Sequence, residues 1–135
     1  MNTFLAPKRT MEDGLIIRCY RIEDAQPLMD ATYESYHHLK RFMPWATASQ
    51  SVDETRDLIA NFIDAYEAND DFVFSIWDQD ETNLLGGSGF HLREGPLKTQ
   101  SAEIGLWINK VHAGRGLGRK ALRAIINWGF TDWPW

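Results

Sequence analysis

The chain has 135 residues, of which 44% are hydrophobic and 24% charged, a composition typical of one soluble globular domain. Its formal net charge of −5 argues against general nucleic-acid binding, and no apolar run approaches the roughly 20 residues that span a bilayer. The single cysteine, Cys19, excludes an intrachain disulfide framework and fits a reducing compartment, so we expect a cytoplasmic protein.

The first half of the chain predicts a strand and two helices. Residues 1–13 mix charges with a proline, and we expect a loosely held lead-in before a single domain over 14–135. The β-rich run 15–20 predicts the first strand. Asp24 is the expected N-cap of a helix from Ala25 to about Leu39.

Ser51 and Glu54 have the spacing of a capping box, which predicts the start of a second helix. The remaining elements are this helix to about Asn69, strands over 72–77, 84–92 and 101–108, and a last helix over about 116–130. We expect the second and third strands to form a hairpin, and the three glycines of the third to mark close backbone approach or a bulge. In the last helix the apolar positions Leu122, Ile125, Ile126, Trp128 and Phe130 are expected to face the sheet.

A glycine-rich loop joins the fourth strand to the last helix. Glycines at positions 114, 116 and 118 leave the backbone open, and the following helix offers unpaired N–H groups and a partial positive charge. Arg115, Arg119 and Lys120 add positive charge, so the segment predicts a phosphate site; the alternative is a plain turn. Arg119 stands where a dinucleotide fingerprint needs glycine. A P-loop ends in Gly-Lys-Ser/Thr, whereas Gly118 is followed here by Arg119-Lys120-Ala121.

The segment Ala113-Gly114-Arg115-Gly116-Leu117-Gly118 resembles the acetyl-CoA loop of GNAT acetyltransferases, Gln/Arg-x-x-Gly-x-Gly/Ala, at every position but the first. The order β-α-α-β-β-β-α is similar to that family over about residues 15–135. The sequences of residues 102–108 and 39–45 resemble the corresponding segments of ribosomal-protein N-terminal acetyltransferases of the Rim type. The resemblance implies an α+β fold whose mostly antiparallel central sheet is flanked by helices. A GNAT domain normally continues with further strands, so we expect a domain truncated after the helix that follows the CoA loop.

This resemblance also implies a reaction. Acetyl-CoA would be the cosubstrate, and an amine would attack its thioester directly; the acceptor would be a protein N-terminal α-amine, ribosomal proteins included, or a small-molecule amine. The expected acetyl-CoA-binding residues are Leu106, Trp107 and Ile108 on the fourth strand, and Ala113, Gly114, Arg115, Gly116, Leu117, Gly118 and Arg119 at the loop. A non-catalytic acyl-CoA-binding or interaction module is the alternative function.

For each candidate residue of the acceptor site the sequence allows two roles. Glu103, a charge inside an apolar strand, is either the base that takes the amine's proton or a solvent-facing, salt-bridged glutamate. His91 either lines the acceptor cleft or lies on the surface. Phe42 and Trp45 either shape the acceptor pocket or form a hydrophobic plug between two helices. We expect no metal site, no direct contact with nucleic acid and no membrane association, and the sequence leaves a homodimer open.

Overall fold

The computed structural model describes residues 4–35 and 51–135. Within these residues one antiparallel sheet has the strand order β1-β2-β3-β4-β5. Its strands are β1 (Arg9–Glu12), β2 (Leu15–Cys19), β3 (Asp71–Asp78), β4 (Leu84–His91) and β5 (Glu103–Ile108). The α-helices described are α1 (Ala25–Glu34), α3 (Val52–Glu67) and α4 (Leu117–Asp132). Short 3-10 helices cover Ile22–Asp24, Leu97–Thr99 and Lys110–His112.

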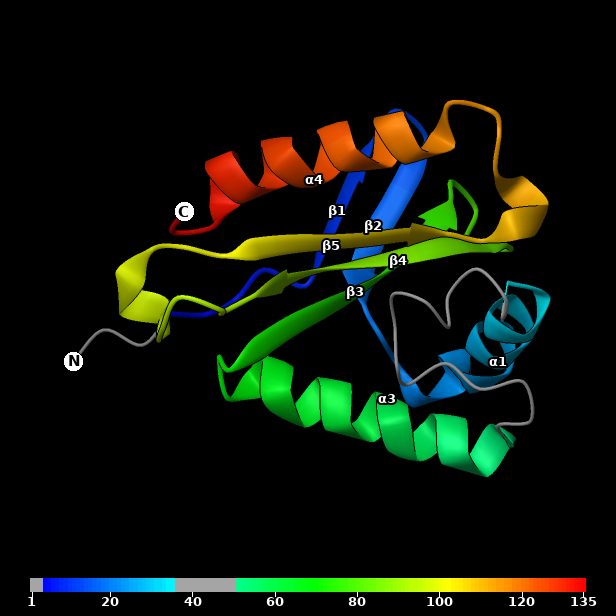
Figure 1. The fold of residues 1–135 in the computed structure, drawn as a ribbon, viewed down its shortest axis with the longest axis horizontal. Helices are drawn as coiled ribbons and strands as arrows, with labels where there is room; N and C mark the ends of the chain where they lie inside the picture. The colour runs from blue at the N-terminus through cyan, green and yellow to red at the C-terminus, as the bar shows by residue number, and fades with distance from the viewer. Residues whose placement is uncertain (1–3, 36–50) are drawn as a thin grey trace.

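The sheet separates two helical layers, with α4 on one face and α1 and α3 on the other (Figure 1). The core on the α4 side joins Phe74 and Phe90 of the sheet to Ile125 and Trp128 of the helix. The core on the opposite side joins strand residues to both helices, and includes Ile16, Trp77, Trp107, Leu28 and Ile59. Both faces of the sheet are therefore covered, as the predicted α+β class requires.

The predicted capping box at the start of the second helix is confirmed. The Glu54 amide donates to Ser51 Oγ at 3.1 Å, and the Ser51 amide donates to Glu54 Oε1 at 3.2 Å. These two bonds satisfy donors that the first turn of a helix leaves free, so α3 begins at Val52. The predicted hairpin of the second and third strands is also confirmed, as the antiparallel pair β3–β4.

The N-terminal segment is held more firmly than the sequence predicted. Arg9–Glu12 is strand β1, paired along its length with β2. The Phe4 ring lies 5.7 Å from the Trp133 ring, and Asn69 Nδ2 donates to the Phe4 carbonyl at 3.0 Å. The Tyr66 hydroxyl donates to the Pro7 carbonyl. The expectation of a loosely held lead-in is therefore wrong for this segment, because its partners lie in distant parts of the chain.

The prediction for the inward face of α4 is wrong in part. Ile125 and Trp128 are buried as expected, but Leu122, Ile126 and Phe130 are exposed, Phe130 by 75%. The helix contacts the sheet through small residues as well, because Ala121 and Ala124 are fully buried. Periodicity alone did not separate these two neighbouring stripes, since each recurs at three- or four-residue spacing.

The glycines of β4 allow close backbone approach, as predicted. A Cβ atom at Gly86 would lie 2.2 Å from the Trp107 carbonyl oxygen. A Cβ at Gly87 would lie 2.4 Å from Trp107 Nε1, so the indole occupies the space that this glycine leaves. The β3–β4 register also shifts between Ile76 and Trp77, which marks the expected irregularity.

Candidate functional site

The glycine loop lies between β5 and the start of α4, at the end of the sheet's outer strand (Figure 1). Gly114 has φ +88° and Gly116 has φ +71°, a left-handed conformation that favours glycine. Gly116 is the N-cap of α4, and its helix start receives no side-chain cap. A Cβ atom built at Gly114 or Gly116 would meet no other atom within 4 Å in the described chain. The loop is therefore open on its outer side.

The main-chain amides of this loop have no partner in the described part of the chain, which leaves them available to an anion. The Lys120 amide donates to the Gly116 carbonyl at 3.1 Å, which is the first turn of the helix. Across residues 4–35 and 51–135 no acceptor lies in reach of the amides of residues 114–119. Exposed N–H groups at a helix N-terminus, together with the helix dipole, form a site for phosphate.

Strand β5 presents half of its main-chain polar groups to an open edge. It pairs with β4 alone within the described residues. The Asn109 amide donates to the Leu85 carbonyl at 2.8 Å, so odd-numbered residues of β5 bond to β4. By the antiparallel alternation, the amides and carbonyls of Ile104, Leu106 and Ile108 face the open edge. An extended ligand arm beside β5 would find donors and acceptors there.

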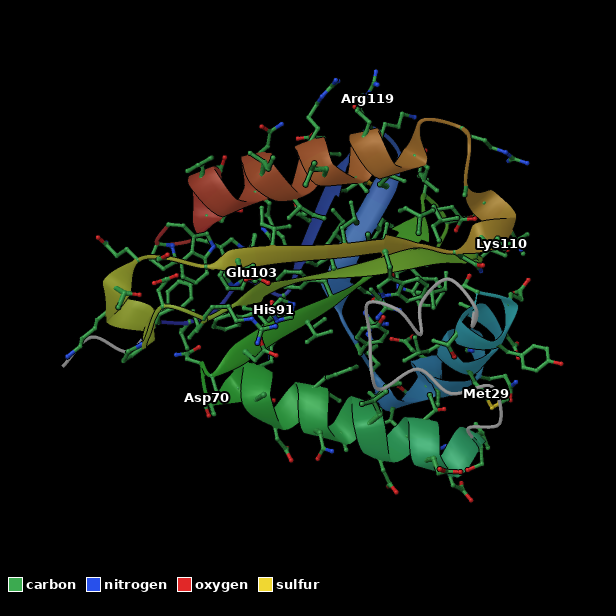
Figure 2. All side chains as sticks on the ribbon, in the orientation of Figure 1. Met29, Asp70, His91, Glu103, Lys110 and Arg119 are labelled. Atoms are coloured by element: carbon green, nitrogen blue, oxygen red, sulfur yellow. The ribbon has the colours of Figure 1, made fainter. Side chains whose placement is uncertain are left out.

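The side chains predicted to bind the cosubstrate differ in their surroundings. Trp107 is buried in the core beneath α1 and α3, whereas Leu106 and Ile108 are half-buried on the α4 side. Arg115 and Arg119 are exposed, and Figure 2 shows Arg119 on the outer side of α4, directed away from the sheet. Trp107 therefore directs its side chain into the core and its main-chain groups toward β4, away from the open edge.

Three cross-strand neighbours form a polar row at the far end of β5. Asp71 of β3 pairs with His91 of β4. His91 in turn pairs with Glu103 of β5, and Figure 2 shows these two residues on neighbouring strands. His91 Nδ1 lies 2.7 Å from Asp71 Oδ1. Glu103 is exposed, and its Oε1 lies 3.7 Å from Arg93 Nε. The structure thus places Glu103 in solvent beside Arg93, and its role as a base stays a prediction. It also gives His91 a carboxylate partner that the sequence analysis missed.

Two further residues that the sequence analysis missed anchor the loop. Asn109 and Ser35 are both buried, and their side chains are hydrogen-bonded to each other. The Lys110 amide also donates to Ser35 Oγ, at 2.8 Å. An asparagine directly after an apolar strand was the available signal for Asn109, but Ser35 lies 74 positions away and carried none.

Phe42 and Trp45, the other predicted acceptor residues, lie outside the described residues. Among the residues that are described, no group of three or more His, Cys, Asp or Glu side chains is placed to hold a metal ion. The same part of the chain contains no helix with the length and apolar character needed to cross a membrane.

Comparison with known proteins agrees with this geometry. Residues 14–135 match the profile of the Acetyltransferase (GNAT) domain, which covers most of the chain. The chain belongs to the GNAT acetyltransferase family. Its antiparallel sheet and its flanking helices are those that the resemblance implied.

Relatives of this GNAT chain include ribosomal-protein acetyltransferases. It is 29% identical over 117 residues to the ribosomal-protein-serine acetyltransferase of Escherichia coli, covering 87% of this chain and 63% of that protein. A solved structure of RimL, the ribosomal L7/L12 alpha-N-protein acetyltransferase in complex with coenzyme A, superposes with a TM-score of 0.75 at 19% identity, covering 87% of this chain and 64% of that one. The structure of the microcin C7 self-immunity acetyltransferase MccE in complex with acetyl-CoA and AMP superposes with a TM-score of 0.75 at 16% identity. That match covers 89% of this chain and 65% of the MccE chain. The GNAT chain therefore spans slightly less than two thirds of these relatives.

Proposed function

We propose that this GNAT chain is the acetyl-CoA-binding part of an N-acetyltransferase, which moves an acetyl group to an amine by direct attack on the thioester. The observation that carries the proposal is that the amides of residues 114–119 have no hydrogen-bond partner among the described residues, at the place where the open edge of β5 meets the N-terminus of α4. The pyrophosphate would lie on these amides. The pantetheine arm would then run along β5, beside the outward main-chain groups of Leu106 and Ile108.

The charges near the loop support a phosphate ligand. Arg115, Arg119 and Lys120 are exposed on the loop and the first turn of α4, in a chain whose net charge is −5. Their flexible side chains would reach the nucleotide phosphates from outside, while the main-chain amides hold the diphosphate. We assign the main chain the larger share, because its donors are already fixed in place by the fold.

The acceptor is proposed to be a protein N-terminal α-amine, as the name of the Escherichia coli relative suggests, with a terminal serine as the first residue to test. Attack requires a neutral amine. An α-amino group has a pKa near 8, so roughly a tenth is neutral at pH 7, whereas a lysine side chain with a pKa near 10.4 is neutral in only a few molecules per ten thousand. An α-amine therefore needs about 3 kcal/mol less help from the protein than a lysine does.

Binding is tested by thermal unfolding with acetyl-CoA and with free CoA, in wild type and in two matched glycine variants. Gly116→Val and Gly14→Val both place a side chain at a left-handed position, with φ +71° and φ +76°. We expect a similar loss of stability in both, but loss of the ligand-induced shift in Gly116→Val only. Equal ligand shifts in the two variants would show that the loop is not the binding site.

Transfer is tested separately by release of the CoA thiol in the presence of peptides. A peptide that begins with serine should release the thiol faster than the same peptide with a blocked N-terminus and a free lysine. Binding of acetyl-CoA without release from any amine would instead favour the acyl-CoA-binding module.

A further inference from the structure

His91 is held in one orientation by a carboxylate on the neighbouring strand. Its Nδ1 lies 2.7 Å from Asp71 Oδ1, a short distance typical of a hydrogen bond to an ionised group. A carboxylate can only accept, so Nδ1 carries the proton and the lone pair of the neutral ring lies on Nε2. The side chain of His91 is 21% exposed, so the imidazole is partly accessible from solvent.

Two glycines give the His91 ring its position above β4 and β5. A Cβ atom at Gly89 would lie 2.8 Å from His91 Cε1 and 2.9 Å from Nε2. A Cβ atom at Gly105, the cross-strand partner of Gly89, would lie 3.0 Å from Nε2. The ring therefore occupies the space that a side chain at position 89 or 105 would fill, and its unprotonated nitrogen lies against Gly105 of the outer strand.

Glu103 has weaker geometry for the same task. Its side chain is 62% exposed, and it shares its surroundings with Arg93, which is 63% exposed. Water surrounds this exposed carboxylate, and the Arg93 guanidinium competes with an incoming amine for its oxygens. As a class, imidazole side chains titrate near neutral pH, which suits a general base better.

We propose that His91, oriented by Asp71, is the base that receives the proton of the acceptor amine; this rests on the proposed acetyl transfer. The amine nitrogen forms a bond to the thioester carbonyl carbon, its proton passes to His91 Nε2, and the carbon–sulfur bond breaks. The electron pair leaves with sulfur as the CoA thiolate, which then takes up a proton from the imidazolium. Asp71 is a positioning residue: it fixes the tautomer and stabilises the imidazolium while the proton is held.

Isosteric variants test the pair. His91→Gln should lower kcat for a serine-initiated peptide by about 10²-fold or more, and Asp71→Asn by at least about tenfold, with the affinity for acetyl-CoA unchanged in both. The matched control is Asp70→Asn, because Asp70 is exposed and precedes Asp71 in the chain. It should keep the wild-type rate. In Asp71→Asn the loss should fall on kcat and leave KM for the peptide unchanged, because the imidazole loses the carboxylate that orients it while the binding residues are unaltered.

The proposal is overturned if His91→Gln keeps the wild-type rate, or if Glu103→Gln gives the larger loss. A second readout does not depend on turnover: nitrogen NMR of the imidazole. In the wild-type protein the His91 ring should show a protonated Nδ1. Its Nε2 resonance should shift when acetyl-CoA is added, and with free CoA it should lie close to the resonance of the ligand-free protein. An Nε2 signal that acetyl-CoA leaves unchanged would overturn the role of His91 even if the chain transfers acetyl groups. Absence of transfer together with the shifted signal would count against the proposed function instead.

Discussion

Ser35 Oγ and Asn109 Oδ1 are joined by a hydrogen bond of 3.0 Å between residues 74 positions apart. Ser35 ends α1, and Asn109 follows β5 immediately. The same hydroxyl accepts the Lys110 amide, and Asn109 Oδ1 also accepts the Val111 amide at 3.3 Å. One buried polar cluster therefore ties the C-terminal end of α1 to the segment that leads into the glycine loop.

Replacing Ser35 by alanine should destabilise this junction. The substitution leaves the Lys110 amide without its acceptor, which costs about 1–3 kcal/mol in a buried site. We expect a lower free energy of unfolding in urea and a weaker affinity for acetyl-CoA, because the loop begins only a few residues later. Tyr33→Phe, at an exposed position of the same helix, is the control. An unchanged affinity with reduced stability would limit the cluster to a structural role.

Removal of Asp24 should be more costly than removal of an exposed acid. Arg18 and Asp24 are 4% and 5% exposed and form two parallel hydrogen bonds, at 2.8 and 2.9 Å. Burial acts to lower the pKa of Arg18, but its hydrogen bonds to Asp24 and Glu81 raise it on balance, so the guanidinium stays charged. Asp24→Ala leaves that charge buried and should cost about 3–5 kcal/mol of unfolding free energy.

The exposed pair of Asp53 and Arg56 provides the comparison, with side chains that are 85% and 50% exposed. Asp53→Ala should cost about 1 kcal/mol or less. Equal losses of unfolding free energy in Asp24→Ala and Asp53→Ala, measured by urea unfolding, would contradict the claim that burial makes the Arg18–Asp24 pair more costly to break. The double variant Arg18→Met/Asp24→Leu should regain much of the stability lost in Asp24→Ala, because Glu81, the charge then left without its Arg18 partner, is 30% exposed to solvent.

Asp78 should give the β3–β4 hairpin an acid-sensitive component of stability. Partial burial acts to raise the pKa of Asp78, but hydrogen bonds from the amides of Asn83 and Thr82 and from the Asn83 side chain outweigh it and lower the pKa. Because the pKa of Asp78 is lower in the folded state than in the unfolded state, the ionised carboxylate stabilises the fold. This stabilisation is complete above the unfolded-state pKa of about 3.9, and it is lost as the pH falls through the lower folded-state pKa.

We therefore expect wild type to be more stable than Asp78→Ala at pH 7, and the difference to shrink in strongly acid solution. Urea unfolding of both proteins across pH measures this difference. A constant difference would mean that the carboxylate charge is not what stabilises the turn.

Trp133 should be the costliest of the aromatic residues near the end of the chain to remove. It is 6% exposed, and its ring lies 4.8 Å from Phe72, 5.0 Å from Phe90 and 5.3 Å from Trp128. Trp133→Ala should cost about 3–5 kcal/mol of unfolding free energy, because it leaves a cavity among these rings. Phe130→Ala, at a 75% exposed position, should change stability little. Comparable thermal unfolding of the two variants would contradict this difference.

The local features of this chain could be predicted from its sequence because their partners are close in sequence. The capping box at Ser51 and Glu54 depends on residues three apart, and the β3–β4 hairpin on strands joined by a short turn. The glycine loop was found for the same reason, since its backbone conformation depends on its own glycines. Resemblance to the GNAT family then supplied the order of the elements, and the family match confirmed it.

Only the tertiary structure decided which distant residues meet. Asp71 and His91 are 20 positions apart, Ser35 and Asn109 are 74 apart, and strand β1 exists because β2 and the aromatic rings around Trp133 hold that part of the chain. It also showed Glu103 exposed beside Arg93 and gave His91 a carboxylate. A side chain's neighbours across a sheet depend on strand register and on the helices packed over it, and neither is encoded in the spacing of one segment.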